Sequence, residues 1–150
     1  MAFDAAAAQA LFDALESHAL TLAIFDRVNT HTPASVPGKG LSCSISLGSV
    51  AATPEASGLA AVSGTITFNV MIFNPMTQRP LDGIDPATLT AVCTLLSEYS
   101  GNFTLGGTVR NIDLLALRAE PAYLEQEGKH FRVEQISVPV VVNDLWSEVA

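Results

Sequence analysis

Charged residues are scarce in this sequence. Asp, Glu, Lys and Arg make up only 15% of the 150 residues, against about 25% in an average globular domain. Only seven of them are Lys or Arg, these are scattered along the chain, and the net charge is −8. A protein that grips nucleic acid needs clustered cations to contact phosphates, so the composition argues against that class of function.

The chain also has few cysteines and no long hydrophobic run. Cys43 and Cys93 are its two cysteines, and both fall at apolar positions of different segments. We expect buried free thiols in a reducing compartment, with a disulfide between them as the alternative. The sequence shows no secretion signal and no apolar run of about 20 residues, so we expect a soluble protein without a membrane partner.

Recognisable catalytic motifs are missing as well. The sequence has three isolated histidines and no GxSxG, HExxH, paired CxxC or Walker pattern, so no nucleophile has a predictable base. Gly106 and Gly107 lack the spacing of a dinucleotide fingerprint and precede a strand pattern. Asp82, Asp85 and Asp113 have structural roles as their simpler interpretation. We therefore predict no enzyme, no catalytic residue, no cofactor and no metal.

What the chain has in abundance is apolar side chains. Hydrophobic residues reach 49%, so much of the surface must be uncharged. One explanation is that neighbouring subunits cover these faces, because exposed apolar patches usually mark interfaces. The other is a general excess of alanine, which is visible in MAFDAAAAQA and SVAATPEASGLAAVSG. The composition leaves both explanations open.

The first half of the chain predicts a helix followed by a hairpin. Apolar residues recur at helical spacing over residues 5–22, Asp4 is a suitable N-cap, and His18 is expected to be a partly exposed helix residue. The segments LSCSISL (41–47) and TITFNVMIF (65–73) alternate with period two and predict antiparallel strands. The serines of the first strand would face water or another subunit.

A second helix is predicted over residues 86–100. Asp85 would be its N-cap, Pro86 its first residue, and Ile84 and Leu89 a hydrophobic staple. Leu89, Val92, Cys93 and Leu96 would form the buried stripe, and Gly101 the left-handed residue that ends the helix.

The last third of the chain predicts further strands. An extended segment is expected from Phe103 to Leu114 with a bend near Arg110, followed by a hairpin whose strands flank EGKH. Pro139 cannot donate a ladder hydrogen bond, so the last strand should lie at a sheet edge or carry a bulge there. Close backbone approach or a bulge would explain Gly106 and Gly107.

Together these elements predict one α+β domain over residues 1–150. Its sheet would be largely antiparallel with about five strands, and two main helices would pack on one face. Residues 29–40 and 48–64 are rich in Pro, Gly and small side chains, so we expect loops there that are flexible or ordered by a partner.

Two stretches of the sequence resemble the tail terminator proteins of long-tailed bacteriophages. They are DGIDPATLTAVCTLLSEYSGNFTLGGTVRNIDLL (82–115) and FRVEQISVPVVVNDLW (131–146). In that family a capped helix leads through a short Gly-Asn/Asp-Phe turn into a TLGG-V-R-ID strand, and a valine-rich strand ends near an aromatic residue. The earlier helix and hairpin agree in order only, and the loops at 29–40 and 48–64 depart from the family's pattern.

The resemblance implies a structural virion protein. It would form a homohexameric ring that caps the tail tube, stops tube polymerisation and provides the surface for head attachment. The implied partners are the tail tube protein and a head-tail connector or stopper protein, at the head-proximal end of a tail assembled in the host cytoplasm. DNA would pass through the lumen without sequence-specific binding, and the acidic chain would repel it.

Two other functions stay open on the sequence alone. The chain is also compatible with a tail tube or head-tail adaptor subunit. A small-molecule-binding or cofactor-free enzyme domain would have the same α+β layout.

The candidate interface residues lie in loops, at strand irregularities and in the tail. Arg79 and Arg110 have an alternative role as ion-pair partners of Asp82 and Asp113, and such exposed pairs contribute at most about 1 kcal/mol. The full set is Pro33, Val36, Lys39, Arg79, Arg110, Pro139 and Trp146.

Overall fold

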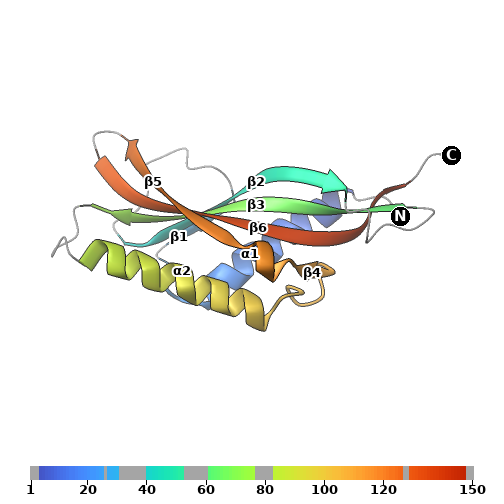
Figure 1. The fold of residues 1–150 in the computed structure, drawn as a ribbon, viewed down its shortest axis with the longest axis horizontal. Coiled ribbons are helices and arrows are strands. Elements are labelled where there is room, and N and C mark those ends of the chain that lie inside the picture. Colours follow the sequence, from blue (N-terminus) through green and yellow to red (C-terminus); the bar gives the residue numbers. More distant parts are fainter. Residues whose placement is uncertain are drawn as a thin grey trace.

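Two helices pack on a twisted, curled sheet (Figure 1). The computed structural model describes residues 4–25, 27–30, 40–52, 61–76, 83–126 and 129–147. In chain order the elements are α1 (Ala5–Thr21), β1 (Arg27–Asn29), β2 (Ser42–Ala52), β3 (Ala61–Pro75), α2 (Ile84–Gly101), β4 (Asn111–Ile112), the 3-10 turn η3 (Leu114–Ala116), β5 (Arg118–Gln126) and β6 (Lys129–Ser147).

The sheet confirms the predicted α+β class. Its strand order is β1-β2-β3-β6-β4, and β5 also pairs with β6. β1 runs parallel to β2, whereas all other pairs are antiparallel, so the sheet is mixed. Both predicted hairpins form, one from β2 and β3 and the other from β5 and β6.

The main core lies between one face of the sheet and the two helices. Alternate residues of the central strands point to this face, as Val70 of β3 and its partner Ile136 of β6 do. They pack against Leu15 of α1 and Leu95 of α2 in one apolar cluster. Burial of these side chains, at about 25 cal/mol per Å² of apolar surface, attaches the helices to the sheet.

A smaller apolar cluster occupies part of the opposite face of the sheet. It contains Phe73, Phe131 and Val133. Ser42 lies directly across from Phe73, and both Ser42 and Ser44 are buried. The prediction that these two serines face water or another subunit is therefore wrong.

Helix α1 forms as predicted, with one difference in burial. The Asp4 carboxylate accepts a hydrogen bond from the Ala7 backbone N–H at 2.9 Å, as expected of an N-cap. His18 is buried rather than partly exposed, because its ring stacks on the Tyr99 ring of α2 at a centroid distance of 4.7 Å. This stack joins the two helices.

Helix α2 begins two residues earlier than predicted. Its N-cap is Gly83, and Asp85 lies inside the first turn without a capping hydrogen bond. Buried Asn74 of β3 donates its side-chain N–H to the Ile84 carbonyl and to the Thr88 hydroxyl, both at 3.1 Å. These contacts with β3 draw Ile84 into the helix.

The buried stripe of α2 is also displaced from the predicted one. Leu89 is 63% exposed, so the hydrophobic staple does not form, and Cys93 is exposed while Cys43 is buried. The buried residues of α2 are Ile84, Thr88, Ala91, Val92, Leu95 and Tyr99.

The segment after α2 is a series of turns and not the predicted strand. Gly101 is the last helical residue, and the C-cap Asn102 has a φ of −139°, so no left-handed glycine ends the helix. Positive φ values occur later, at Leu105, Gly106 and Gly107. A Cβ on either of these glycines would meet nothing within 4 Å. Left-handed backbone, and not close approach, is their role.

The last strand is interior to the sheet, so the prediction of an edge at Pro139 is wrong. β6 pairs with β3 on one side and with β4 and β5 on the other. The Pro139 carbonyl accepts a hydrogen bond from the Asp113 N–H at 2.9 Å, and the chain then leaves the ladder through η3 before β5 begins. Pro139 therefore faces an interruption in the neighbouring strand, where no ladder donor is needed.

Candidate interaction surfaces

The described residues contain no cluster of three or more His, Cys, Asp or Glu side chains that could hold a metal ion. Cys43 is the buried cysteine, and burial raises the pKa of its thiol to about 12. Burial also raises the pKa of Tyr99, with a smaller contribution from Cys43. Both groups stay protonated at neutral pH, which makes Cys43 unsuitable as a nucleophile.

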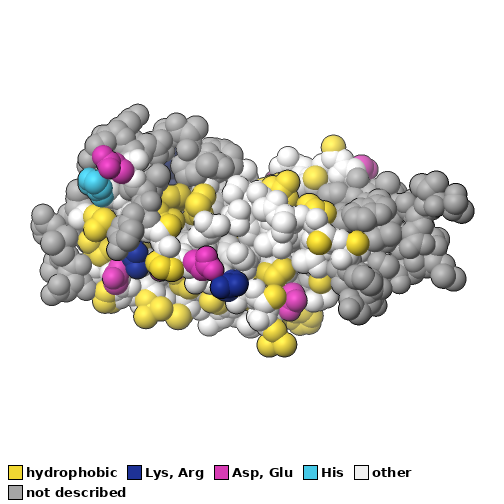
Figure 2. Space-filling view, turned by 45° about the horizontal axis from the view of Figure 1, so that its top comes forward, with side chains coloured by type: hydrophobic (Ala, Val, Ile, Leu, Met, Phe, Trp, Pro, Cys, Tyr) yellow, Lys and Arg dark blue, Asp and Glu magenta, His cyan; other side chains and the backbone are white. Residues whose placement is uncertain are grey.

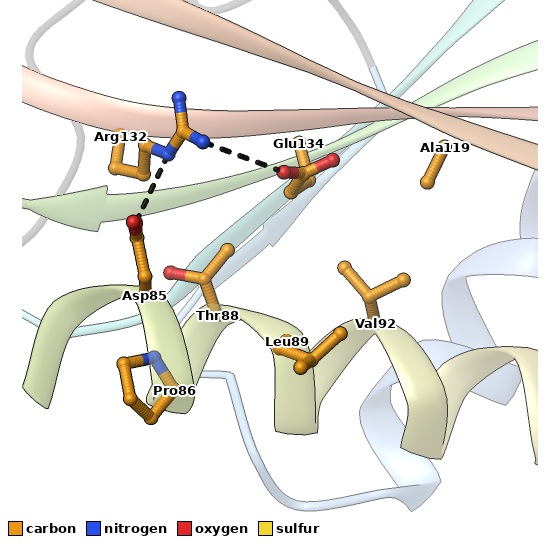
Figure 3. Close-up of a pocket in the computed structure, with 8 residues that line it drawn as sticks. All are labelled: Asp85, Pro86, Thr88, Leu89, Val92, Ala119, Arg132 and Glu134. Atoms are coloured by element: carbon orange, nitrogen blue, oxygen red, sulfur yellow. Dashed lines mark hydrogen bonds and ion pairs between the residues drawn. The ribbon is translucent and has the colours of Figure 1, made fainter.

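A groove of about 530 Å³ lies between α2, β5 and β6. Figure 3 shows Asp85, Thr88, Leu89 and Val92 rising from α2 toward the sheet. The full lining is Asp85, Pro86, Thr88, Leu89, Val92, Ala119, Arg132 and Glu134.

One cation and two carboxylates stand at an end of this groove. The Arg132 guanidinium lies 3.1 Å from the Asp85 carboxylate and 4.0 Å from the Glu134 carboxylate (Figure 3). These partners neutralise Arg132, so it offers little attraction to an anionic ligand. The remaining lining is mostly apolar and places no nucleophile beside a base.

A second groove, of about 250 Å³, lies between α1 and the far end of the β2–β3 hairpin. Leu47 and Val50 of β2 form one side of it and are 57% and 51% exposed. The residues that line it are all apolar: Ala8, Leu11, Phe12, Leu47, Val50, Ile66 and Phe68.

The sheet face opposite the helices is mostly uncharged. Figure 2, in which the top of Figure 1 is turned toward the viewer, shows uncharged surface with a few charged side chains. Thr67, Asn69 and Ser137 lie on this face in adjacent positions of β3 and β6. Its charged pair Arg118 and Glu120 forms an exposed ion pair at 2.9 Å. Arg27 of β1 also lies on this face, across from Ser42, so the described part of the face carries few charges of either sign.

The predicted interface residues do not gather at one place. Arg110 is exposed at the entrance to β4, where its guanidinium donates to the Asn143 side-chain oxygen at 3.4 Å and not to Asp113. Pro139 is buried in β6. The Trp146 backbone pairs with Val62, but its side chain lies outside what the structure describes. Pro33, Val36, Lys39 and Arg79 lie outside the described residues, as does Asp82.

Sequence reasoning missed the two grooves. The first joins residues 47 positions apart, Asp85 and Arg132, and no local spacing predicts such a contact. The alternation of β2 did mark Leu47 as an apolar position. It did not indicate that the buried part of β2 ends before Leu47.

In comparisons with known proteins, no protein-family profile matches this chain and no curated protein matches it significantly. Among the described residues, no helix has the length and hydropathy needed to cross a membrane.

Proposed function

We propose that this chain is a structural subunit of a bacteriophage tail, a tail terminator that acts by forming a homohexameric ring. The observation that carries the proposal is that large apolar side chains are exposed at several separate parts of the fold, including the end of the β2–β3 hairpin and the segments around β4. Leu47 and Val50 lie at the far end of the β2–β3 hairpin, and Phe103 and Leu115 flank β4 in the chain.

Two different apolar surfaces on one subunit suit a ring. In a cyclic assembly of more than two copies, one surface of a subunit meets a different surface of the next, and closure prevents open-ended growth. The sequence resemblance at 82–115 and 131–146 supports the same proposal independently. It adds the specific role of capping the tail tube and presenting the other side of the ring to the head connector.

The open sheet face supports passage of DNA through such a ring. Hydroxyl and amide side chains such as Thr67, Asn69 and Ser137 carry no charge, so they neither hold nor strongly repel phosphates. This differs from the expectation of an acidic lining, since the described charges of this face are the balanced Arg118–Glu120 pair and, on β1, the exposed Arg27 across from Ser42. A tube or head-tail adaptor subunit has the same requirement for an inert lumen.

The α2–β5–β6 groove is the specific feature that favours the other class of function. Its volume falls within the range of about 300–1,000 Å³ that is usual for small-molecule sites. A binding or cofactor-free enzyme domain would place its ligand between Leu89 and Ala119. The paired Arg132 gives such a ligand no free charge to recognise.

The test combines solution mass with tube capping. Analytical ultracentrifugation should show association toward six copies at high concentration, and electron microscopy should show the protein at one end of purified tail tubes. Addition to polymerising tube protein should stop elongation. A chain that stays monomeric at all concentrations and leaves tube growth unchanged would contradict the proposal, and a saturable small ligand would favour the alternative.

A further inference from the structure

The outer edge of β2 is only partly covered. β1 pairs with Ser42, Cys43 and Ser44, and in the part of the chain that the structure describes nothing pairs with β2 on that side beyond Ser44. Among the described residues, the backbone N–H and C=O groups on this edge over residues 46–52 thus have no neighbouring strand. A row of such groups is a template for an additional strand.

The outer edge of β5 makes an instructive contrast. β5 also has a partner on one side only among the described residues, namely β6. It carries Arg118, Glu120, Pro121 and Glu125, and charges and proline are the devices by which proteins keep an edge from pairing. Residues 46–52 of β2, SLGSVAA, contain no charge and no proline. The register shift between Leu47 and Val50 is the one irregularity in its pairing with β3, so this edge is less protected against pairing than that of β5.

The side chains along the open edge of β2 also lack cover. Leu47 and Val50 face the same side of the sheet as α1, and beside them runs the apolar groove against Ala8 and Phe12. A strand added next to β2 would cover the flanks of Leu47 and Val50 and satisfy the open backbone groups in one contact. Side chains alone would leave the backbone groups unpaired.

We propose that residues 46–52 of β2 pair with a strand of a second copy of this chain, an inference that rests on the proposed ring. Each copy carries a net charge of −8, so a contact between two copies has the least like-charge repulsion where at least one of its surfaces is free of charge. The segment from Ser42 to Ala52 has no charged residue at all. It is therefore the surface on which an identical, acidic chain is accepted at least electrostatic cost.

The mating strand in the second copy is the end of β6, residues 143–147, which carries one charged residue, Asp144, and whose register against β3 shifts between Val142 and Trp146. β4 reaches only Val141 of β6, so beyond it the outer edge of β6 is also unpaired within the described residues. β2 and β6 both run antiparallel to β3 and lie on opposite sides of it. Their free ends lie at the same end of the molecule (Figure 1). Parallel pairing of β2 with β6 would continue the sheet from copy to copy.

Amide hydrogen exchange on the assembled protein tests the backbone pairing. Amides in peptides covering 46–52 and 143–147 should exchange about tenfold or more slowly in the assembly than in unassembled protein, because open ladder groups become bonded. Peptides of β5, 118–126, should exchange equally in both and serve as the internal reference. Equal exchange of 46–52 in both states would overturn the proposal.

Leu47→Lys provides the unassembled reference and a second test. A lysine on an open edge disfavours edge pairing, so association should weaken by about tenfold or more. The matched control is Leu89→Lys, at a comparably exposed position on α2, which should associate as the wild type does. Circular dichroism checks that both variants are folded. Loss of association in Leu89→Lys and not in Leu47→Lys would overturn the proposal.

The outcomes separate this inference from the ring function. Rings that cap tubes while 46–52 exchanges freely would leave the function standing and reject the strand pairing. Protection of 46–52 in an oligomer that never arrests tube growth would support the strand pairing and reject the tail role.

Discussion

Ile45 and Leu47 are two residues apart on β2 and face the same side of the sheet, but they differ in burial. Ile45 is fully buried and pairs with Val70, whereas Leu47 pairs with buried Phe68 and is 57% exposed. Both are aliphatic residues in a regular ladder. The difference lies in what covers them, because Ile45 packs into the main core cluster, whereas Leu47 lines the groove beside α1.

The two halves of β2 therefore have different roles, one in the core and one at the surface. The near half, with Cys43 and Ile45, belongs to the core that holds the fold together. In the far half, the corresponding apolar residues Leu47 and Val50 line a groove beside the outer edge of β2. A buried residue stabilises the monomer, whereas an exposed one of the same type contributes only when something else covers it.

The largest expected effect is a difference in the free energy of unfolding between substitutions in the two halves of β2. Ile45→Ala should lower the free energy of unfolding by about 2–5 kcal/mol, because it removes buried methyl groups and leaves a cavity. Leu47→Ala should change it by only about 0.5 kcal/mol in the unassembled protein. Urea denaturation of dilute protein measures both. Equal losses in the two variants would show that the far half is covered within the monomer.

An intermediate effect concerns pH. The pKa of Cys43 in the near half rises from its ordinary value of 9.0 to about 12 in the folded protein. The unfolded chain therefore loses this proton first, and stability falls as the pH rises above about 9, by about 1 kcal/mol at pH 10. Tyr99 acts in the same direction at higher pH. Urea midpoints between pH 7 and 10 measure the loss.

Two variants sharpen this pH test. Cys43→Ala should lower stability at neutral pH and reduce its further decline toward pH 10. Leu47→Cys places a thiol in the exposed far half, and in a Cys93→Ser background it should react with a thiol reagent while Cys43 stays protected in the folded protein. Rapid labelling of Cys43 in the native state would contradict the burial of the near half.

The smallest effect is expected at the polar link between α2 and β6. Asp85→Asn removes one carboxylate from Arg132, which keeps its contact with Glu134. Because Asp85 is largely exposed, the loss should be at most about 1 kcal/mol and should shrink in high salt. Thermal melts at low and high ionic strength measure it. A larger, salt-independent loss would mean that packing and not charge holds α2 there.

Local sequence patterns predicted the parts of the fold that are determined locally. The alternation of Cys43 and Ile45 located β2, and Asp4 located the start of α1, since a cap and a period of two are properties of neighbouring residues. The three-residue strand β1 was missed. It is too short to show a period, and it exists only because it lies beside β2.

Tertiary contacts explain where those patterns failed. Asp85-Pro86 has the local features of a helix start, yet the hydrogen bonds from Asn74 to Ile84 and Thr88 set the boundary and rotation of α2. This rotation buries Thr88 and exposes Leu89. No spacing in the sequence predicts that Asn74, ten residues before Ile84, will donate these hydrogen bonds.

The candidate surfaces were less predictable than the fold. Low charge predicted that some faces are uncharged, and the described open sheet face agrees with that. The predicted interface residues fall mostly in loops, because prolines and glycines are the local signals of loops in a sequence. The open edge of β2 depends instead on where β1 ends, at Asn29 opposite Ser44, which only the three-dimensional pairing reveals.

Pro139 has a consequence that reaches beyond its own strand. Its ring nitrogen has no hydrogen to donate, so the neighbouring chain bonds only to the Pro139 carbonyl, through the Asp113 N–H, and then turns outward as η3. Leu115, at the middle of that turn, is 100% exposed. The missing backbone N–H of Pro139 inside the sheet thereby leads to an exposed apolar turn at Leu115 outside it. Replacing the proline would remove the reason for that turn.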